Sequence, residues 1–223
     1  VALKVTAPLG LGRRLVASTA LKFREKHPEI DVQLRLSDYL VDLFTEAVDV
    51  ALRLAVLTDS SLIVRKIADV DRVLCASPDY LARNGEPRRI EDLDDHQCLL
   101  LRFPGSQQSR WTLQRGRRIH AVPVHGHLDA DDSDILTDWA LAGEGIAMKP
   151  RFEVAANLEA GRLVQVLPDC PPVPATLAVL HAYKRMVPAK VKDFADVLVA
   201  DARAHVTEAL AGGSGAKPKS RRG

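Results

Sequence analysis

The sequence predicts an α/β fold in which a parallel sheet is covered by helices. The first observation is the order of strand, helix, strand, helix and strand in the N-terminal part, which is typical of parallel sheets. The second is length: 223 residues suffice for one large domain or two small lobes with a real core. The third is composition, because 47% apolar and 27% charged residues are ordinary for a globular protein.

The N-terminal elements follow from hydrophobic periodicity. Leu11, Leu15 and Phe23 recur at multiples of four positions, which predicts a helix up to about residue 26. His27-Pro28 ends that helix, because a residue before proline disfavours the helical region. Residues 31–36 alternate polar and apolar side chains, as a strand with one buried face does. We expect strands at residues 3–7, 32–36 and 49–54, the helix just described, and a short helix at residues 41–47.

The middle of the chain predicts a long strand or strand pair, followed by a second group of elements. Asp131-Asp132-Ser133 is a strong helix start, because each side chain can accept from free amide groups. This helix should carry Ile135, Leu136, Trp139 and Ala140 inward and stop at Gly143 or Gly145. The other expected elements are a strand or strand pair at 62–76, a helix at 78–84, a helical turn within 86–96, strands at 98–101, from 111, at 119–128 and at 146–149, and a helix before Gly161.

The C-terminal part predicts a link, a strand, a helix and a tail. Cys170 to Pro174 is a stiff extended link and a candidate hinge, because three of its five residues are prolines. A strand at 176–182 and a helix from Pro188 to about residue 205 follow. We expect residues 207–223 to be a disordered tail, since the last stretch has no large apolar side chain.

Composition narrows the function classes. A net charge of +2, from 31 basic and 29 acidic residues, leaves no broad basic face for nucleic acid. Three widely spaced cysteines form no metal motif and suggest free thiols in a reducing cytoplasm, with a redox switch as the alternative. No apolar run reaches membrane-spanning length and no signal peptide opens the chain, so we expect a cytoplasmic protein without membrane contact. Nothing indicates a cofactor.

A set of short motifs in a fixed order resembles one known family. The set includes Asp49-Val-Ala-Leu-Arg53, Cys75-Ala-Ser-Pro-Asp-Tyr-Leu81 and Ala142-Gly-Glu-Gly-Ile-Ala147. Together they resemble the effector-binding domain of LysR-type transcriptional regulators. The residues within the motifs are most similar to those of the glycine-cleavage-activator branch.

The resemblance implies a type II periplasmic-binding-protein-like fold, with two Rossmann-like lobes joined by two crossing strands. Lobe I would be residues 1–73 plus 174–206, and lobe II residues 74–173. A small-molecule effector would bind in the cleft between them. The family also implies a homodimer of this part, a tetramer at full length, and promoter DNA contacts only through an N-terminal winged helix-turn-helix that we expect to be absent from this chain.

The resemblance also implies the site residues. Ligands of open α/β sheets lie beyond the carboxyl ends of strands, where helix N-termini present free amides. The predicted effector-binding residues are Pro8, Leu9, Gly10, Ser37, Asp38, Arg102, Phe103, Asp131, Asp132 and Ser133. The predicted dimer contacts are Leu15, Ala20, Phe23 and Leu136, with a buried core face as the alternative.

Charge leaves the effector's nature open. The acids at 129, 131, 132 and 134 would repel a carboxylate in a partly dry cleft. Either Arg102 or Arg53 offsets them, or the ligand is neutral or cationic. Arg53 could clamp a carboxylate, but we favour a structural pair with Asp38 or Asp49. His125 and His127 share a strand face, yet surface histidines are the favoured interpretation over a metal site.

Two other functions are alternatives to the sensor. A solute-binding receptor of a transporter would share the two-lobe fold. An enzyme would need convergent catalytic side chains, and Ser60, Ser61 and Ser77 lack a nucleophile-elbow context. We therefore predict a sensor domain rather than an enzyme.

Overall fold

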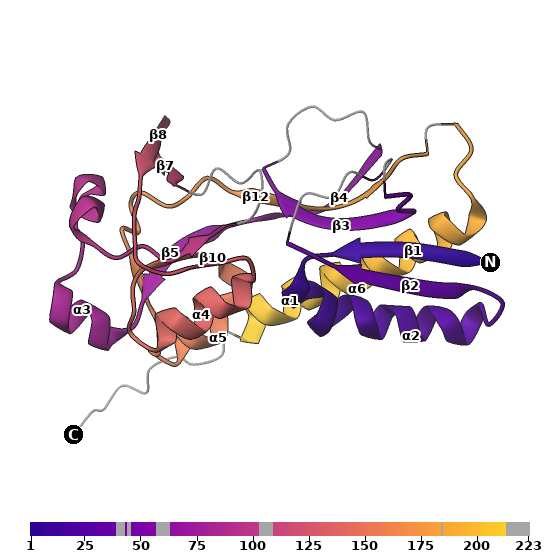
Figure 1. The fold of residues 1–223 in the computed structure, drawn as a ribbon, viewed down its shortest axis with the longest axis horizontal. Helices are drawn as coiled ribbons and strands as arrows, with labels where there is room; N and C mark the ends of the chain where they lie inside the picture. The colour runs from indigo at the N-terminus through magenta and orange to yellow at the C-terminus, as the bar shows by residue number, and fades with distance from the viewer. Residues whose placement is uncertain (39–42, 44–45, 57–62, 103–108, 184, 213–223) are drawn as a thin grey trace, which may run out of the picture.

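The molecule consists of two bodies that lie side by side along its longest axis (Figure 1). The computed structural model describes residues 1–38, 43, 46–56, 63–102, 109–183 and 185–212. The N-terminus lies at the outer end of one body (Figure 1). We call this body, which holds β1 to β4, β12, α1, α2 and α6, lobe I, and the body with β5 to β11 and α3 to α5 lobe II.

Lobe I is built on one five-stranded mixed sheet in the order β2-β1-β3-β12-β4. The strand–helix–strand alternation predicted a parallel sheet, and β1 indeed pairs in parallel with β2 and β3. The prediction is incomplete, because β12 enters from the C-terminal part and pairs antiparallel with both β3 and β4. The strands are β1 (Ala2–Ala7), β2 (Asp31–Leu36), β3 (Val50–Ala55), β4 (Ile63–Val70) and β12 (Ala175–His181).

One face of this sheet is covered by α2 and α6, which form the main core. Phe23 of α2 meets Phe194 of α6 edge to face at 5.2 Å between ring centroids. A smaller apolar cluster around Leu43 and Val48 covers the other face at β3 and β12. The helical elements are α1 (Leu9–Leu11), the π-helical turn η1 (Gly12–Val16), α2 (Ala17–Lys26) and α6 (Ala189–Gly212).

Lobe II has a small antiparallel sheet, β10-β5-β11, flanked by helices and two short strand pairs. Its strands are β5 (Arg72–Ala76), β6 (Leu100–Leu101), β7 (Arg110–Arg115), β8 (Arg118–Pro123), β9 (Asp129–Ala130), β10 (Ala147–Pro150) and β11 (Val164–Val166). Its helices are α3 (Pro78–Asn84), the 3₁₀ turn η2 (Ile90–Asp95), α4 (Ser133–Leu141) and α5 (Arg151–Glu159).

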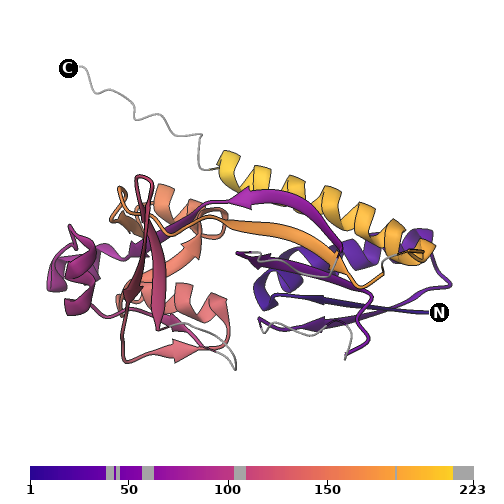
Figure 2. The same ribbon diagram turned by 90° about the horizontal axis from the view of Figure 1, so that it is seen from above.

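Two chain segments cross between the lobes (Figure 2). The first runs from β4 directly into β5, so the predicted strand pair is correct. The second is the proline-rich stretch before β12. Its backbone is hydrogen-bonded to β7, where Gln114 N–H donates to Pro171 O at 2.7 Å. Arg72 Nε–H donates to Val173 O at 2.8 Å and thereby joins the two crossings.

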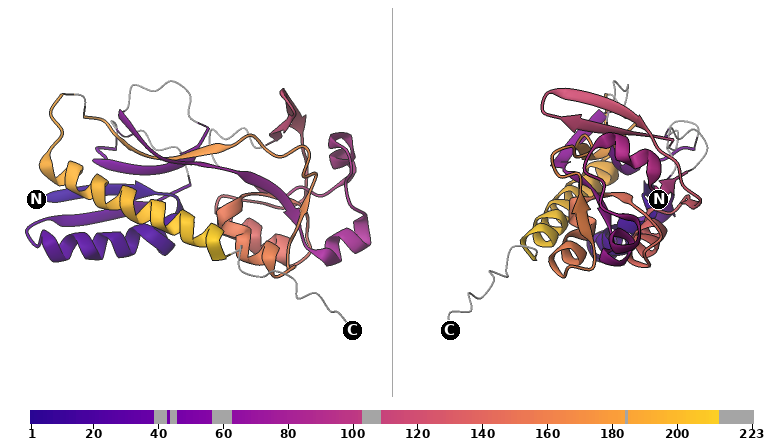
Figure 3. Two further views of the ribbon diagram at one scale, coloured as in Figure 1. Left: turned by 180° about the vertical axis from the view of Figure 1, so that it is seen from behind. Right: turned by 90° about the vertical axis from the view of Figure 1, so that its left-hand side faces the viewer.

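Helix α6 extends further than the sequence predicted. It continues to Gly212, so residues 207–212 are helical and not part of a disordered tail. From behind, α6 runs along lobe I and reaches α5 of lobe II (Figure 3). There His205 meets Phe152 edge to face at 6.1 Å. Six more residues are therefore helical, although of these only Ala209 packs against the core.

Several expected side-chain positions also differ. Three of the four predicted dimer contacts, Leu15, Phe23 and Leu136, are at most 5% exposed within this single chain. Their periodicity marks the core face of their helices, so these side chains have no surface left for a partner. Ala20 is half-buried. Ile135, expected inside, is 37% exposed. Most of residues 41–47, expected as a helix, lies outside the described residues.

Candidate functional site

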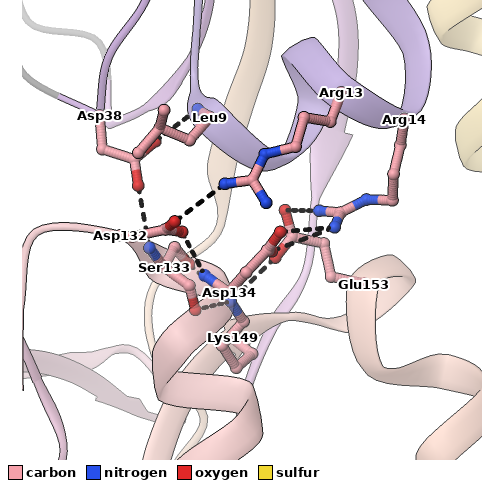
Figure 4. Close-up of polar contacts among 9 residues, drawn as sticks. All are labelled: Leu9, Arg13, Arg14, Asp38, Asp132, Ser133, Asp134, Lys149 and Glu153. Carbon is pink, nitrogen blue, oxygen red and sulfur yellow. Dashed lines mark hydrogen bonds and ion pairs between the residues drawn. The ribbon is translucent and has the colours of Figure 1, made fainter.

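The N-terminal ends of two helices face each other across the lobes (Figure 4). One is the helical run that begins at Leu9 in lobe I, and the other is α4, which begins at Ser133 in lobe II. Asp38 lies between them. Its Oδ1 accepts from Leu9 N–H and its Oδ2 accepts from Ser133 N–H, both at 2.9 Å. A carboxylate thus satisfies free amides of both helix ends, where negative charge is favoured.

Burial and hydrogen bonding act in opposite directions on Asp38. Desolvation raises the pKa of its carboxyl group, and the field of Asp132 adds to this. The two amide hydrogen bonds and Lys149 lower it, but desolvation is the largest cause and the net shift is upward. Asp38 is therefore a carboxylate held between the lobes at an electrostatic cost.

A second link joins Asp132 to Arg13. Asp132 is the N-cap of α4, and its Oδ1 accepts from Asp134 N–H at 2.9 Å. Its Oδ2 lies 3.0 Å from Arg13 Nη2 in lobe I. The helix start predicted at Asp131-Asp132-Ser133 is correct, and of these three side chains Asp132 is the N-cap. The same side chain also forms an ion pair across the cleft.

An ionic network that is partly exposed at Arg14 and buried at Lys149 continues from Arg14. Its guanidinium binds both carboxylate oxygens of Asp134, at 2.9 and 3.1 Å, and lies 3.7 Å from Glu153. Lys149 is 0% exposed and donates to Ser133 O at 2.8 Å. Glu153 Oε2 lies 3.0 Å from Lys149 Nζ, although the pair lacks the alignment of a hydrogen bond. Lys149 thus fixes the first turn of α4.

Beside these links lies a cavity of about 280 Å³ that both lobes line. The volume is at the lower end of the range for ligand pockets, roughly 300 Å³ upward. Its walls are mostly apolar, with acids at the helix ends and two arginines. The lining residues are Pro8, Gly10, Leu11, Ser37, Asp38, Arg53, Leu54, Ala55, Arg72, Leu99, Leu101, Trp111, Ser133, Asp134, Leu136, Met148, Pro150, Glu153 and Ala175.

Arg53 is the most buried cation that lines the cavity, at 8% exposure. Its Nη1 donates to Leu52 O at 2.9 Å and its Nη2 to Thr6 Oγ1 at 3.2 Å, both uncharged oxygens. The favoured pair with Asp38 or Asp49 is wrong, because among the described residues neither lies within ion-pair distance. Burial lowers the pKa of Arg53 to about 10, against the field of Asp38.

Arg72 is the second arginine of the wall. Burial lowers its pKa as well, and its Nε–H donates to a backbone carbonyl, Val173 O. Arg72 also lines a neighbouring, more polar cavity of about 360 Å³ with Gln114, Arg151 and Gln165. Arg72 therefore lines the inter-lobe cavity and also contacts the second crossing segment.

The structure brings together about half of the predicted effector residues. Pro8, Gly10, Ser37, Asp38 and Ser133 line the cavity. Leu9 contributes its amide to Asp38, and Asp132 pairs with Arg13.

Two further predicted residues, Arg102 and Asp131, lie outside the cavity wall. Arg102 is not in the cavity wall: its side chain is half exposed and lies 3.6 Å from Asp129. It therefore does not offset the acids of the α4 terminus that line the cleft. Asp131 is exposed, and Phe103 lies outside the described residues.

Sequence reasoning missed the cations that balance the acids. Arg13 and Arg14 lie in the π-helical turn of lobe I, 119 and 120 residues before their partners. Their position one turn after a predicted cleft residue, Gly10, was the available signal. Trp111 is 1% exposed and also lines the cavity. Among the described residues no group of three potential ligands could hold a metal ion.

Comparisons with known proteins agree with this architecture. The family model described as the LysR substrate binding domain matches residues 2–203. DmlR, an HTH-type transcriptional regulator of Escherichia coli K12, is 35% identical over 167 residues, covering 75% of this chain and 54% of DmlR. The activator TtdR of the same strain is 30% identical over the same lengths. The chain spans about half the length of these curated relatives.

Solved structures show the same fold. The full-length Vibrio cholerae virulence activator AphB has a TM-score of 0.73 at 32% identity, over 89% of this chain and 68% of AphB. The regulatory domain of CrgA from Neisseria meningitidis has a TM-score of 0.73 at 30% identity, over 90% and 98%.

These relatives are regulators, which favours the sensor over the transporter receptor. The glycine-cleavage-activator branch stays a prediction. Over the described residues, no helix is long and apolar enough to cross a membrane. With its fold, its inter-lobe cavity and a family match over almost its whole length, the chain belongs to the substrate-binding domain family of LysR-type transcriptional regulators.

Proposed function

We propose that the chain senses a small molecule in the inter-lobe cavity and does no chemistry. The observation that carries this is the position of the cavity: its wall draws residues from both lobes, next to the contacts that hold the lobes together. A ligand there contacts both lobes at once. It therefore changes the balance between open and closed arrangements by its differential affinity for them.

The signal would pass to a DNA-binding segment of the full-length protein, as the helix-turn-helix names of the relatives suggest. We further propose a homodimer of this part, a tetramer at full length, and action in the cytoplasm. Sedimentation velocity on this chain and on the full-length protein tests the stoichiometry. A monomer at micromolar concentration would contradict the dimer.

A thermal-shift screen with a cavity-filling control tests the sensor. A ligand that binds the folded state raises Tm by mass action. Leu101→Trp fills the cavity, whereas Ile119→Trp adds the same bulk to a side chain that is 64% exposed. We expect a hit that Leu101→Trp loses and Ile119→Trp keeps. A hit that both variants keep would place the ligand elsewhere.

A further inference from the structure

The charge of the chain is unevenly distributed along the sequence. Residues 97–128 hold five arginines and no aspartate or glutamate, although the net charge of the whole chain is only +2. A small net charge predicts no broad basic face, but it leaves room for a local basic surface. Four of these arginines lie on the hairpin of β7 and β8: Arg110, Arg115, Arg117 and Arg118.

The hairpin arginines are exposed and have no acidic partner. All four residues are exposed, and over the described parts of the chain no ion pair or hydrogen bond involves their side chains. The turn at Gly116 adjoins the more polar cavity of about 360 Å³, whose wall holds Asp71 and Asp169 but also Arg72 and Arg151. Two acids and two cations balance that wall by itself. The charge of the hairpin is therefore not compensated there.

The arrangement of the arginines at the turn is unfavourable on its own. Arg115 and Arg118 are directly opposite each other in the register of β7 and β8, and Arg117 lies between them in the turn. Like charges in directly opposite positions destabilise a strand pair. The turn conformation needs only Gly116, whose φ is +59°. The hairpin fold thus gives no reason for these three side chains, which we call the turn arginines, and such local conflicts are typical of functional sites.

The hairpin is attached to a segment that joins the lobes. Figure 1 shows β7 and β8 at the upper edge of lobe II, away from α4 and α5. The edge of β7 that does not pair with β8 is bonded to the second crossing: Gln114 N–H donates to Pro171 O at 2.7 Å, and Val173 N–H donates to Thr112 O at 3.0 Å. A contact at the turn therefore acts on the crossing segment as well.

We propose that the turn arginines bind the phosphate backbone of duplex DNA. A guanidinium binds a phosphate through two parallel hydrogen bonds, and duplex DNA carries about one negative charge per 1.7 Å of its axis. Neither cavity described above is lined by the turn arginines, so a small anion would not be enclosed there, whereas an extended polyanion needs no enclosure. Among polyanions, DNA is favoured because the relatives are HTH-type regulators.

This contact goes beyond the sensor function and does not depend on a ligand in the inter-lobe cavity. It also differs from the expectation that promoter DNA is contacted only through an N-terminal helix-turn-helix. Phosphate contacts position a protein on DNA but do not read its sequence. The hairpin would therefore add affinity to the contacts of the DNA-binding segment without changing which sequence they select.

Fluorescence anisotropy with short labelled duplexes at low salt tests the proposal on this chain. We expect salt-dependent binding in the range of about 10⁻⁴–10⁻⁶ M that is typical of sequence-independent contacts. Two duplexes of unrelated sequence should bind alike. If the folded chain binds neither duplex, the proposal is wrong.

A triple variant locates the contact. In Arg115→Gln/Arg117→Gln/Arg118→Gln, the slope of log K against log salt should become shallower by about 0.9 for each phosphate contact that is lost. The same slope in the variant and in wild type would overturn the assignment to the hairpin.

The matched control removes three charges from lobe I. Lys26→Gln/Arg35→Gln/Lys192→Gln changes the net charge by the same amount, and these three residues are exposed and form no ion pair within the described ranges. The control should keep the wild-type slope. An equal loss in both triple variants would show that overall charge binds DNA, which would contradict the proposal.

Reversing one charge separates binding from a structural role. Arg118→Glu places opposite charges at directly opposite positions of the hairpin, so we expect no loss in Tm together with weaker DNA binding. A lower Tm would show that Arg118 supports the fold and would remove the argument for a partner. Binding to phosphatidylserine vesicles in place of the duplexes would assign the surface to membranes and overturn the DNA contact. None of these outcomes bears on the ligand screen, so the sensor function is judged separately.

Discussion

At the scale of single residues, the Asp38 carboxylate accepts the helix-end hydrogen bonds that a bound anion would otherwise accept. Removing it leaves two amide groups, of Leu9 and Ser133, without an acceptor, at a cost of about 1–3 kcal/mol each when desolvated. We predict that Asp38→Ala lowers Tm and that added formate, a free carboxylate, restores it in part. Asp129→Ala, which removes an exposed acid 3.6 Å from Arg102, should show no such rescue. Equal effects of formate on both variants would contradict this role.

Lys149 is the most buried charge of the network, at 0% exposure. Lys149→Met would leave the Glu153 carboxylate, 11% exposed, with Arg14 at 3.7 Å as its one remaining ion-pair partner among the described residues. Breaking a buried pair from one side costs about 3–5 kcal/mol, and we predict a loss near the lower limit because Arg14 remains. Urea unfolding measures it. Adding Glu153→Gln to Lys149→Met should recover part of the lost stability. A Lys149→Met protein as stable as wild type would show that the Lys149–Glu153 pair is not charged.

At the scale of elements, local patterns predicted most helices and strands. Apolar spacing over 11–23 and proline at 28 give the first helix and its end correctly, because both are local in sequence. The same spacing cannot show which surface the apolar face meets, so it leaves both a dimer contact and a core face open for Leu15 and Phe23, and both side chains are buried in the core. Antiparallel β12 and the partners of Arg13 and Arg14 depend on contacts more than a hundred residues apart, which no local pattern encodes.

The approach of α1 to α4 depends on a glycine. A Cβ atom at Gly10 would lie 2.4 Å from Arg14 Nη2 and 2.8 Å from Asp134 Oδ1, so this pair must shift to admit it. We predict that Gly10→Ala loosens the two helix ends. Amide exchange at residues 133–136 should rise, with a loss of stability of about 1 kcal/mol. Gly116→Ala, on the open turn of the β7–β8 hairpin, adds the same methyl group where nothing lies within 4 Å. Exchange at 133–136 should not change in that control, although its positive φ costs some stability.

At the scale of the whole molecule, the lobes are held together by two crossing segments, by α6 and by charge. The two crossings are continuous chain and limit the range of motion, whereas α6 belongs to lobe I and touches α5 of lobe II by side-chain packing. The ionic contacts are partly exposed: Arg14 is 40% and Asp134 27% accessible. Pairs of this kind contribute about 0–1 kcal/mol each and weaken with salt. The exposed ion pairs therefore favour the observed arrangement of the lobes by only a small margin. A small margin suits contacts that a ligand must shift.

This margin predicts that reversing one charge opens the lobes and that reversing its partner closes them again. Arg14→Glu sets a third acid against Asp134 and Glu153, so like charges replace the attraction across the cleft. X-ray scattering at low salt should give a larger radius of gyration than wild type, with the difference shrinking as salt rises. Combining it with Asp134→Arg restores an opposite-charge pair and should return the radius toward wild type. If Arg14→Glu leaves the radius unchanged at low salt, the crossings and α6 fix the angle by themselves, and a ligand in the cavity would have no lobe movement to bias.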